Sequence, residues 1–311
     1  MGLGLAISTD FMRACEASRR WRRLRLRWCG AAALPPELIA ASPREENISS
    51  LASFARTLAS VFRDLALQDH LQVGLPDSSV QTCLLLADGL PQEAAACRNY
   101  LLGRLADLLD VKPEDSWLSY KAMTNPLPGP QYIVLCALSA NKVIQQYERA
   151  LAESRVRYSG FAPSSVLLFN LFRRQLLGPP EVPVLLVNAT DEALTTIITV
   201  DGCPVFWRTR APGEPGNGGR APADDPREEL LGDVAEAIVY GEARLGTETP
   251  ATVLVTGPLA RQPGFMGWLA GQVGLPAAFL DAGQLVEREA RGVAAEGWDR
   301  WAPALGAAAQ P

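Results

Sequence analysis

Short apolar runs separated by turn residues occupy the centre of this chain, from Val184 to Arg210. Val184 to Val187 is long enough for a buried strand and too short for a helix. Leu194 to Val200 is rich in β-branched residues, and Asp201-Gly202 is a strong hairpin signal before the apolar run Val205-Phe206-Trp207. The pattern therefore predicts a meander of three strands joined by two turns.

A similar pattern opens the chain. Leu3 to Thr9 predicts a first strand, Asp10-Phe11 a turn, and Met12 to Ala17 a second strand. Each of the two meanders is followed by helical patterns and further strands. The chain has 311 residues, enough for two domains that each bury a core, so we expect two related halves.

From residue 23 onward, charged and apolar residues alternate strictly. The basic residues of one face are Arg23, Arg25 and Arg27, and the apolar residues of the other are Leu24, Leu26 and Trp28. This predicts a half-buried third strand with a basic outer face. Such a face is ordinarily solvated. The alternative is a contact with anionic lipid headgroups or an acidic partner, since about 1 kcal/mol per basic residue is available near such a membrane.

The remaining elements follow from helical spacing or from short apolar runs. A helix is expected after a cap at Asn47 or Ser49, and another after a cap at Ser139. The expected helices are 51–62, 91–109, 141–153, 163–177, 228–245, 262–273 and 298–308. The expected strands are 71–75, 81–86, 117–123, 132–138, 156–160, 251–256 and 277–280. The Pro- and Gly-rich segment 211–226 predicts a flexible, solvated loop.

The composition is that of an ordinary globular protein, with 48% hydrophobic and 20% charged residues. A net charge of −5 argues against general nucleic-acid binding. No apolar run approaches the roughly 20 residues that span a bilayer. No basic region precedes the apolar N-terminal stretch, so a buried strand is expected there instead of a signal peptide.

The cysteine and histidine residues indicate neither a metal site nor a histidine-based triad. None of the cysteines has CxxC or other metal-ligand spacing, and most lie in apolar patterns, which suggests a reducing compartment, the cytoplasm. His70 is the single histidine and is expected to be an ordinary helix-end residue. The six cysteines are Cys15, Cys29, Cys83, Cys97, Cys136 and Cys203.

Several segments, taken in order, resemble one known family. GLAISTDFMRACE (Gly4 to Glu16) is similar to an opening GLDIGSSSVKAVE, and the mixed segment Leu71 to Val166 is similar in order to a small inserted subdomain. VLLVNATDEALTTIITVDGCPVFWRTRAPG resembles a strand-turn-strand with "DiG" at the turn, VLVTGPLA (Val253 to Ala260) resembles "i.LtGGga", and Ala302 to Ala309 resembles a closing small-residue helix. The chain thus resembles the PilM family of type IV pilus assembly, in the actin-like ATPase superfamily.

This resemblance implies an α/β fold of the actin-like (ribonuclease H-like) type with two domains. The first would span residues 1–180, with a small α+β subdomain inserted at about 80–155. The second would span 181–311, carry the flexible loop 211–226, and return its last helix to the first domain.

The resemblance also places a phosphate-binding hairpin at the first turn of each meander. Such a hairpin needs a carboxylate to organise Mg²⁺ and a glycine that lets backbone N–H groups approach phosphate oxygens. The first hairpin has Ala6 and Ser8 at these positions, and the second has Asn188 and Thr190. In the turn on the adenosine side the first glycine is retained, but the next position is Pro258, which lacks an N–H.

We therefore interpret the site as a vestigial nucleotide site with no catalytic residue and no metal ligand, and we expect no bound ATP or Mg²⁺. Asp10 and Asp191 lie nearby but are offset from the expected carboxylate positions. The vestigial site comprises Ser8, Thr9, Asp10, Asn188, Thr190, Asp191 and Gly257.

The resemblance implies a non-catalytic cytoplasmic scaffold, peripheral to the bacterial inner membrane. It would bind the N-terminal cytoplasmic peptide of a PilN-type membrane protein, in a groove between the first domain and its insert, and would relay to platform proteins and the assembly motor. No nucleic-acid partner is expected. One alternative is an active ATPase of the same family, which Ala6 and Asn188 argue against. The other is the cytoplasmic component of a type II secretion platform, whose chain usually continues into a transmembrane helix that this sequence lacks.

Overall fold

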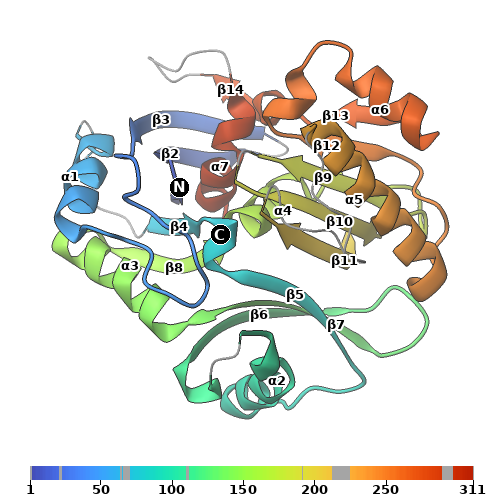
Figure 1. The fold of residues 1–311 in the computed structure, drawn as a ribbon, viewed down its shortest axis with the longest axis horizontal. Helices are drawn as coiled ribbons and strands as arrows, with labels where there is room; N and C mark the ends of the chain where they lie inside the picture. Colours follow the sequence, from blue (N-terminus) through green and yellow to red (C-terminus); the bar gives the residue numbers. More distant parts are fainter. Residues whose placement is uncertain are drawn as a thin grey trace.

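The architecture consists of two lobes side by side and a smaller subdomain that lies below both in Figure 1. Each lobe is built on one β-sheet, and the small subdomain on a third. His70, Asp191 and most of the expected loop 211–226 lie outside the residues that the structure describes. The computed structural model describes residues 2–20, 23–63, 65, 71–109, 112–190, 192–211, 225–288 and 297–310.

The first lobe contains a six-stranded sheet in the order β14-β3-β2-β1-β4-β8. Its first three strands form the predicted antiparallel meander, and β4 and β8 add to β1 in parallel. The strands are β1 (Gly2–Ile7), β2 (Phe11–Arg20), β3 (Arg23–Ala33), β4 (Leu71–Leu75), β8 (Tyr158–Pro163) and β14 (Val286–Arg288).

The second lobe repeats this plan in the five-stranded order β11-β10-β9-β12-β13. A meander again comes first, and β12 pairs in parallel with its first strand, as β4 does with β1. Asp201 and Gly202 both have positive φ (52° and 69°), as the predicted two-residue hairpin turn requires. The strands are β9 (Val184–Ala189), β10 (Leu194–Val200), β11 (Cys203–Arg210), β12 (Val253–Thr256) and β13 (Ala277–Phe279).

The small subdomain contains a three-stranded antiparallel sheet in the order β5-β7-β6, with one helix, α2, packed on it. Leu84 and Met123, on the other face of this sheet, pack against core residues of the second lobe. The elements are β5 (Gln81–Ala87), α2 (Ala94–Leu109), β6 (Ser116–Thr124) and β7 (Tyr132–Ala140).

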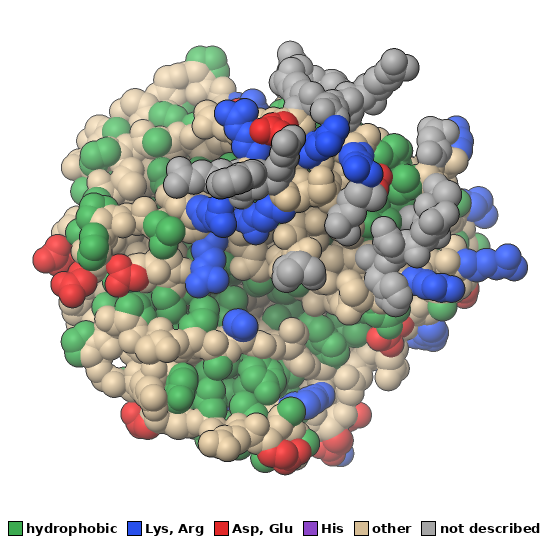
Figure 2. Space-filling model, turned by 180° about the vertical axis from the view of Figure 1, so that it is seen from behind, with side chains coloured by type: hydrophobic (Ala, Val, Ile, Leu, Met, Phe, Trp, Pro, Cys, Tyr) green, Lys and Arg blue, Asp and Glu red, His purple; other side chains and the backbone are tan. Residues whose placement is uncertain are grey.

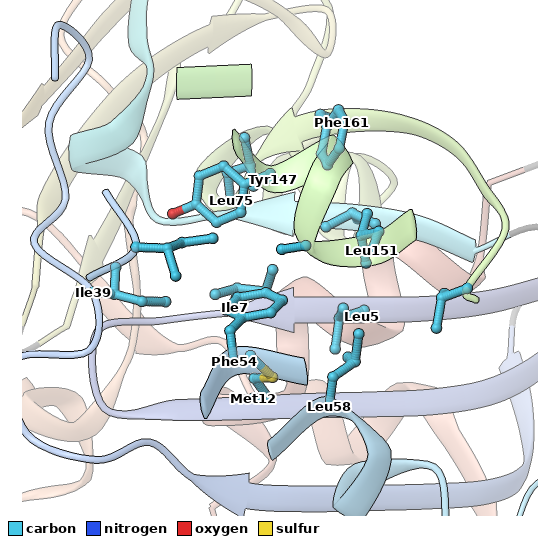
Figure 3. Packing of buried hydrophobic residues seen from close by; sticks show 14 of the residues in the cluster. Leu5, Ile7, Met12, Ile39, Phe54, Leu58, Leu75, Tyr147, Leu151 and Phe161 are labelled. Atoms are coloured by element: carbon cyan, nitrogen blue, oxygen red, sulfur yellow. The ribbon is translucent and has the colours of Figure 1, made fainter. Parts of the chain in front are cut away.

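The first sheet is covered by helices on both faces. Alternate residues of β1 point to opposite sides, so Leu5 and Ile7 enter one core and Ala6 enters another. Helices α1 (Leu51–Val61) and α3 (Asn141–Glu153) cover the first core, and α4 (Ser164–Phe172) and α7 (Ala302–Ala308) cover the second. Figure 3 shows the first core, with residues of α1 and α3 gathered around β1 and β2: Phe54, Leu58, Tyr147, Leu151, Leu5, Ile7 and Met12.

The second sheet has its own helices, α5 (Pro226–Tyr240) and α6 (Phe265–Val273). The expected helix 228–245 differs in two ways: Asp225 caps its start by accepting a hydrogen bond from the Arg227 N–H (2.8 Å), and its last turn, Gly241–Leu245, is π-helical. Helix α6 begins three residues later than expected because Gly264 is left-handed (φ 76°).

Strand β3 contains a bulge that the alternating pattern did not reveal. Its pairing with β2 shifts register at Arg27, which is the extra residue. Trp28 therefore leaves the face of Leu24 and Leu26, which pack in the core beside α7, and stacks instead on Phe62 at the end of α1, with ring centroids 5.7 Å apart. The expectation that Trp28 shares a face with these leucines was wrong.

Two expected helix caps are also wrong. Ser50, not Asn47 or Ser49, caps α1, and its hydroxyl accepts from the N–H of Ser53. The cap residue of α3 is Ala140, which offers no side-chain bond. In each case the expected cap makes a tertiary contact instead, which short-range sequence spacing does not encode: Asn47 accepts from the Ser79 hydroxyl (2.5 Å), and the Ser139 hydroxyl donates to the Ser79 carbonyl (2.9 Å).

Two further differences concern chain ends of elements. Helix α4 ends at Phe172 instead of residue 177, turns follow over residues 173–176, and Leu177 is largely exposed. Strand β14 was not expected. It has three residues, too few for a periodic signal, and it exists because β3 offers a free edge at Leu24 to Leu26.

Helix α7 approaches the backbone of β1 closely. A Cβ atom at Gly4 would lie 2.2 Å from the carbonyl oxygen of Ala304, and one at Gly2 would lie 2.2 Å from that of Ala308. At Gly306 a Cβ would lie 2.2 Å from the Leu167 carbonyl oxygen of α4. Helix α7 can therefore lie this close to both the sheet and α4 only because these three positions are glycines, which have no side chain.

We predict that Gly4→Ala lowers the free energy of unfolding by about 1–3 kcal/mol, because the methyl group cannot enter without moving α7. Gly103→Ala on α2 is a matched control. No atom lies within 4 Å of its added Cβ, so the helix interior should gain about 0.5–1 kcal/mol. Urea denaturation of the three proteins measures both effects, and an unchanged midpoint for Gly4→Ala would contradict this close approach.

Candidate functional site

The first turns of the two meanders face each other across a cavity between the lobes. The cavity volume is about 90 Å³, and its lining comes from both lobes. Cavities that hold drug-sized ligands usually measure about 300–1,000 Å³. The polar residues that line it are Ser8, Asp10, Arg13, Asp77, Ser164, Asn188, Thr190, Glu192, Asp299 and Arg300.

The first turn, between β1 and β2, satisfies its own polar groups. The Ser8 hydroxyl donates to an Asp10 carboxylate oxygen (2.5 Å) and accepts from the N–H of Phe11 (3.0 Å). The Ser8 N–H donates to the carbonyl of Phe11 (2.9 Å). Asp10 is thus held by the turn that it belongs to.

The second turn, between β9 and β10, reaches across the cavity to the first. The Thr9 hydroxyl donates to Glu192 Oε1 (2.6 Å), and the Thr9 backbone N–H donates to the same oxygen. One carboxylate thus takes two donors from the opposite lobe. This pair is the Thr9–Glu192 bridge.

Thr190 shapes the turn that presents this carboxylate. Its hydroxyl accepts hydrogen bonds from the N–H groups of Ala193 (3.0 Å) and Glu192 (3.3 Å). A β-branched residue where the resemblance expects a phosphate-loop glycine therefore has a structural role here, because its hydroxyl closes the turn.

Asn188 and Gly257 lie at the base of the second turn. Asn188, at the end of β9, is buried, lines the cavity, and pairs in register with Thr256 of β12. Gly257 has φ 105°, and a Cβ there would lie 1.9 Å from the Ala189 carbonyl oxygen. Its retention is explained by packing of two neighbouring turns, with no need for a ligand.

Sequence reasoning selected Asp10 and Asp191 as the nearby acids and missed Glu192. Asp191 lies outside the described residues. The signal that could have indicated Glu192 is its position next to Asp191 in the sequence of the same turn. Among the predicted residues, the structure brings Ser8, Thr9, Asp10, Asn188 and Thr190 to the cavity region, and places Gly257 behind it.

Burial raises the pKa of Glu192, and the two hydrogen bonds from Thr9 oppose that shift, while the negative charge of Asp10 adds to it. For Arg13, burial has the opposite effect and lowers the pKa of the guanidinium, while the negative charge of Asp10 raises it. The cavity thus combines partly desolvated charges of both signs.

Asp77 forms the floor of the cavity at the entry to the small subdomain. It lies in a short 3₁₀ turn (Asp77–Ser79) and accepts hydrogen bonds from the Ser165 N–H (2.9 Å) and hydroxyl (2.7 Å), so that it caps α4 from a distance. Burial raises the pKa of Asp77 to about 6, against the opposing effect of these hydrogen bonds.

The basic residues of β3 lie away from this cavity. Arg23 and Arg27 are exposed, and Arg25 is half-buried opposite Glu287 of β14. Figure 2, seen from behind, shows more Lys and Arg than Asp and Glu side chains on the upper middle of that face. Contact of Arg23, Arg25 and Arg27 with anionic lipid stays a prediction.

Within the described ranges, no three or more His, Cys, Asp or Glu side chains are arranged to hold a metal ion. No described helix combines the length and the apolar character needed to cross a membrane.

No protein-family model and no curated protein matches the sequence. Solved structures do match. The "PilM-PilN type IV pilus biogenesis complex" contains a chain that is 14% identical, with a TM-score of 0.76 over 99% of this chain and 97% of the other. The cytoplasmic domain of EpsL, an inner membrane component of the Vibrio cholerae type II secretion system, is 11% identical, with a TM-score of 0.51 over 98% and 93%.

The fold is actin-like. Within the actin-like fold, the β1–β2 and β9–β10 turns are the two hairpins that the resemblance assigned to phosphate binding. In this chain they are joined by the Thr9–Glu192 bridge.

We predict a pH-dependent difference in stability between the protein and its Asp77→Asn variant. Because the pKa of Asp77 is higher in the folded protein, its contribution to the free energy of unfolding is fully present at pH values below its ordinary pKa of 3.8. That contribution is lost as the pH rises through about 6. Between these limits the wild type should lose up to about 3 kcal/mol relative to the variant.

Urea denaturation from pH 4 to pH 8 measures this difference. Asp88→Asn, an exposed aspartate of the small subdomain, is the control and should change the unfolding free energy by less than about 0.5 kcal/mol at every pH. A difference for Asp77→Asn that does not vary with pH would contradict the assignment.

Proposed function

We propose that this chain is a non-catalytic actin-like scaffold of a type IV pilus assembly machine. It lies in the cytoplasm, peripheral to the inner membrane, and binds the N-terminal cytoplasmic peptide of a PilN-type membrane protein. The observation that carries the non-catalytic part of the proposal is the Thr9–Glu192 bridge.

The bridge supports this proposal because it uses groups that a nucleotide would need. Backbone N–H groups at such a turn are natural donors to phosphate oxygens. Here the Thr9 N–H and hydroxyl already bind the Glu192 carboxylate. A phosphate brought to the same donors would have to displace this carboxylate and then lie beside it, and like charges at such distances repel. The scaffold therefore holds its lobes together without ATP or Mg²⁺.

The residues that would organise Mg²⁺ are also replaced. Ala6 lines the cavity where the resemblance expects the first carboxylate, and Asn188 lines it where the second is expected. An amide and a methyl group do not supply the anionic oxygens that Mg²⁺ prefers. An active ATPase of the same fold is the competing function, and these two positions disfavour it.

A groove between the first lobe and the small subdomain suits the proposed peptide. Its volume is about 700 Å³. Asn141, the first residue of α3, lines this groove, and no side chain caps the start of the helix. The charged residues of its lining are Arg44, Glu45, Lys112, Asp115 and Lys142.

The excess of positive charge in this lining suits a peptide that carries a carboxylate. The similar chain of known structure was solved as a PilM-PilN complex, which favours a PilN-type partner. Platform proteins and the assembly motor are the further partners of the scaffold. The similarity to the cytoplasmic domain of EpsL favours a type II secretion platform as the second candidate setting.

We predict that titration with a fluorescent ATP analogue and Mg²⁺ shows no saturable binding up to millimolar concentration. Binding at micromolar concentration would overturn the non-catalytic proposal. The Asn188→Asp variant, measured in the same way, tests whether the remainder of the site can still accept Mg-ATP.

Loss of the Thr9–Glu192 bridge should also lower the stability of the folded protein by a measurable amount. Glu192→Ala leaves two donors of Thr9 without their acceptor, so the unfolding free energy should fall by about 1–2 kcal/mol. Glu153→Ala, an exposed glutamate at the end of α3, is the matched control and should change it by less than about 0.5 kcal/mol.

For the groove, we predict that Lys112→Glu weakens binding of the N-terminal cytoplasmic peptide of a PilN-type protein by on the order of tenfold. Lys121→Glu is the matched control, since Lys121 is also an exposed lysine of the small subdomain but lies outside the groove lining. Fluorescence anisotropy of the labelled peptide measures both. Equal effects of the two variants would place the peptide elsewhere.

A further inference from the structure

Four of the six cysteines lie directly opposite one another in antiparallel strand pairs. Cys83 of β5 pairs with Cys136 of β7, and Cys15 of β2 pairs with Cys29 of β3. Directly opposite residues in such pairs have Cα atoms about 4.5 or 5.5 Å apart. Both spacings fall within the window of about 4.4–6.8 Å that a disulfide requires. All four thiols are free in the structure.

The Cys83–Cys136 pair belongs to a row of reactive side chains across the small subdomain. Tyr120 of β6 is the partner of Cys136 on the other side, and Cys97 of α2 packs over the row. Cys97 and Cys136 lie in the same buried cluster, and Cys83 and Tyr120 pack against it. The side chains of opposite strands are therefore already in contact.

The two cysteine pairs differ in their surroundings. Cys83 and Cys29 are both partly exposed, but interaction with the Cys136 thiol lowers the pKa of the Cys83 thiol. Burial raises the pKa of both thiols of the other pair, to about 11 for Cys29 and further for Cys15. Because the thiolate is the nucleophile, Cys83 is the thiol that an external reagent meets first. Cys136 has no exposed surface and lies where it can attack a modified Cys83.

We propose that Cys83 and Cys136 form a reversible dithiol–disulfide site that exchanges with low-molecular-weight disulfides of the glutathione class. This site is independent of the vestigial nucleotide site. The described residues offer no set of three ligands for a metal ion around it, so thiol–disulfide exchange is the chemistry that the pair supports.

The exchange takes place in two balanced steps. The Cys83 thiolate attacks one sulfur of oxidised glutathione, the S–S bond breaks, and one glutathione leaves as a thiolate that takes a proton from water. Cys136 then loses its proton and attacks the Cys83 sulfur of the mixed disulfide, and the second glutathione leaves in the same way. Two protein thiols and one glutathione disulfide become one protein disulfide and two glutathione thiols.

The bond would join the two strands that carry the small subdomain. Strand β5 follows directly on the Asp77–Ser79 turn at the cavity, and its Leu84 packs against cores of both lobes. A link from β5 to β7 thus fixes the sheet that contacts the second lobe, and so connects the redox state of the cell to the stiffness of the scaffold.

The test incubates the full native chain in mixtures of oxidised and reduced glutathione. The reaction is quenched with acid, free thiols are alkylated under denaturing conditions, and cross-linked peptides are identified by mass spectrometry. We expect the Cys83–Cys136 disulfide to be half-formed at a ratio of oxidised to reduced glutathione at least on the order of tenfold lower than Cys15–Cys29, and to be reversed by dithiothreitol.

Single variants separate the two steps. Cys136→Ala should stop at a stable mixed disulfide on Cys83, and Cys83→Ala should take up no glutathione at this pair. Cys29→Ala, in the other pair, is the matched control and should leave the reaction unchanged.

Peptide mapping of the wild type decides the matter even where a variant fails to fold. The proposal is overturned if Cys83 and Cys136 stay fully alkylatable under conditions that oxidise Cys15–Cys29. It is equally overturned if no pair oxidises, or if wild-type Cys83 accumulates as the glutathione adduct.

Discussion

The close backbone approach of α7 to β1 is the constraint on which the arrangement of the lobes depends. Glycines at residues 2 and 4 let the helix backbone lie directly on the strand, and Gly306 does the same against α4. The core around α7 also includes Leu186, Ile197 and Trp207 of the second lobe. A helix held farther from the first sheet would therefore disturb the packing between lobes as well as within one.

The parts of the fold that follow from local pattern were predictable from the sequence. Both meanders were recognised from short apolar runs, and the hairpin at Asp201-Gly202 from two residues that tolerate positive φ. The parts that depend on distant partners were not. The bulge at Arg27 is visible only in the pairing of β3 with β2, and β14 exists because a remote edge was free. The expected caps Asn47 and Ser139 were diverted to a tertiary partner, Ser79, that lies far away in sequence.

The candidate site shows the same division. Comparison of motifs located the two turns and identified the residues replaced in them. It did not locate Glu192, because the motif fixes positions within a hairpin, whereas the carboxylate acts across the cavity on the other lobe. Gly257 shows the opposite error: it matches the motif, and its left-handed geometry against Ala189 accounts for it without any ligand. In this fold, a residue that matches the motif therefore need not be functional, and a functional residue need not match the motif.

The order of strands in the first sheet has a consequence for synthesis of the chain. This sheet includes β14, and α7 covers the face to which Ala6 points, so residues far apart in the sequence meet in one core. The first lobe accordingly cannot complete its core until the residues of β14 and α7 have left the ribosome. Contacts between residues so far apart in sequence close large loops and slow folding. Until then the β3 edge and the face of the sheet that α7 covers stay exposed. A nascent chain with such exposed apolar surface depends most on chaperones.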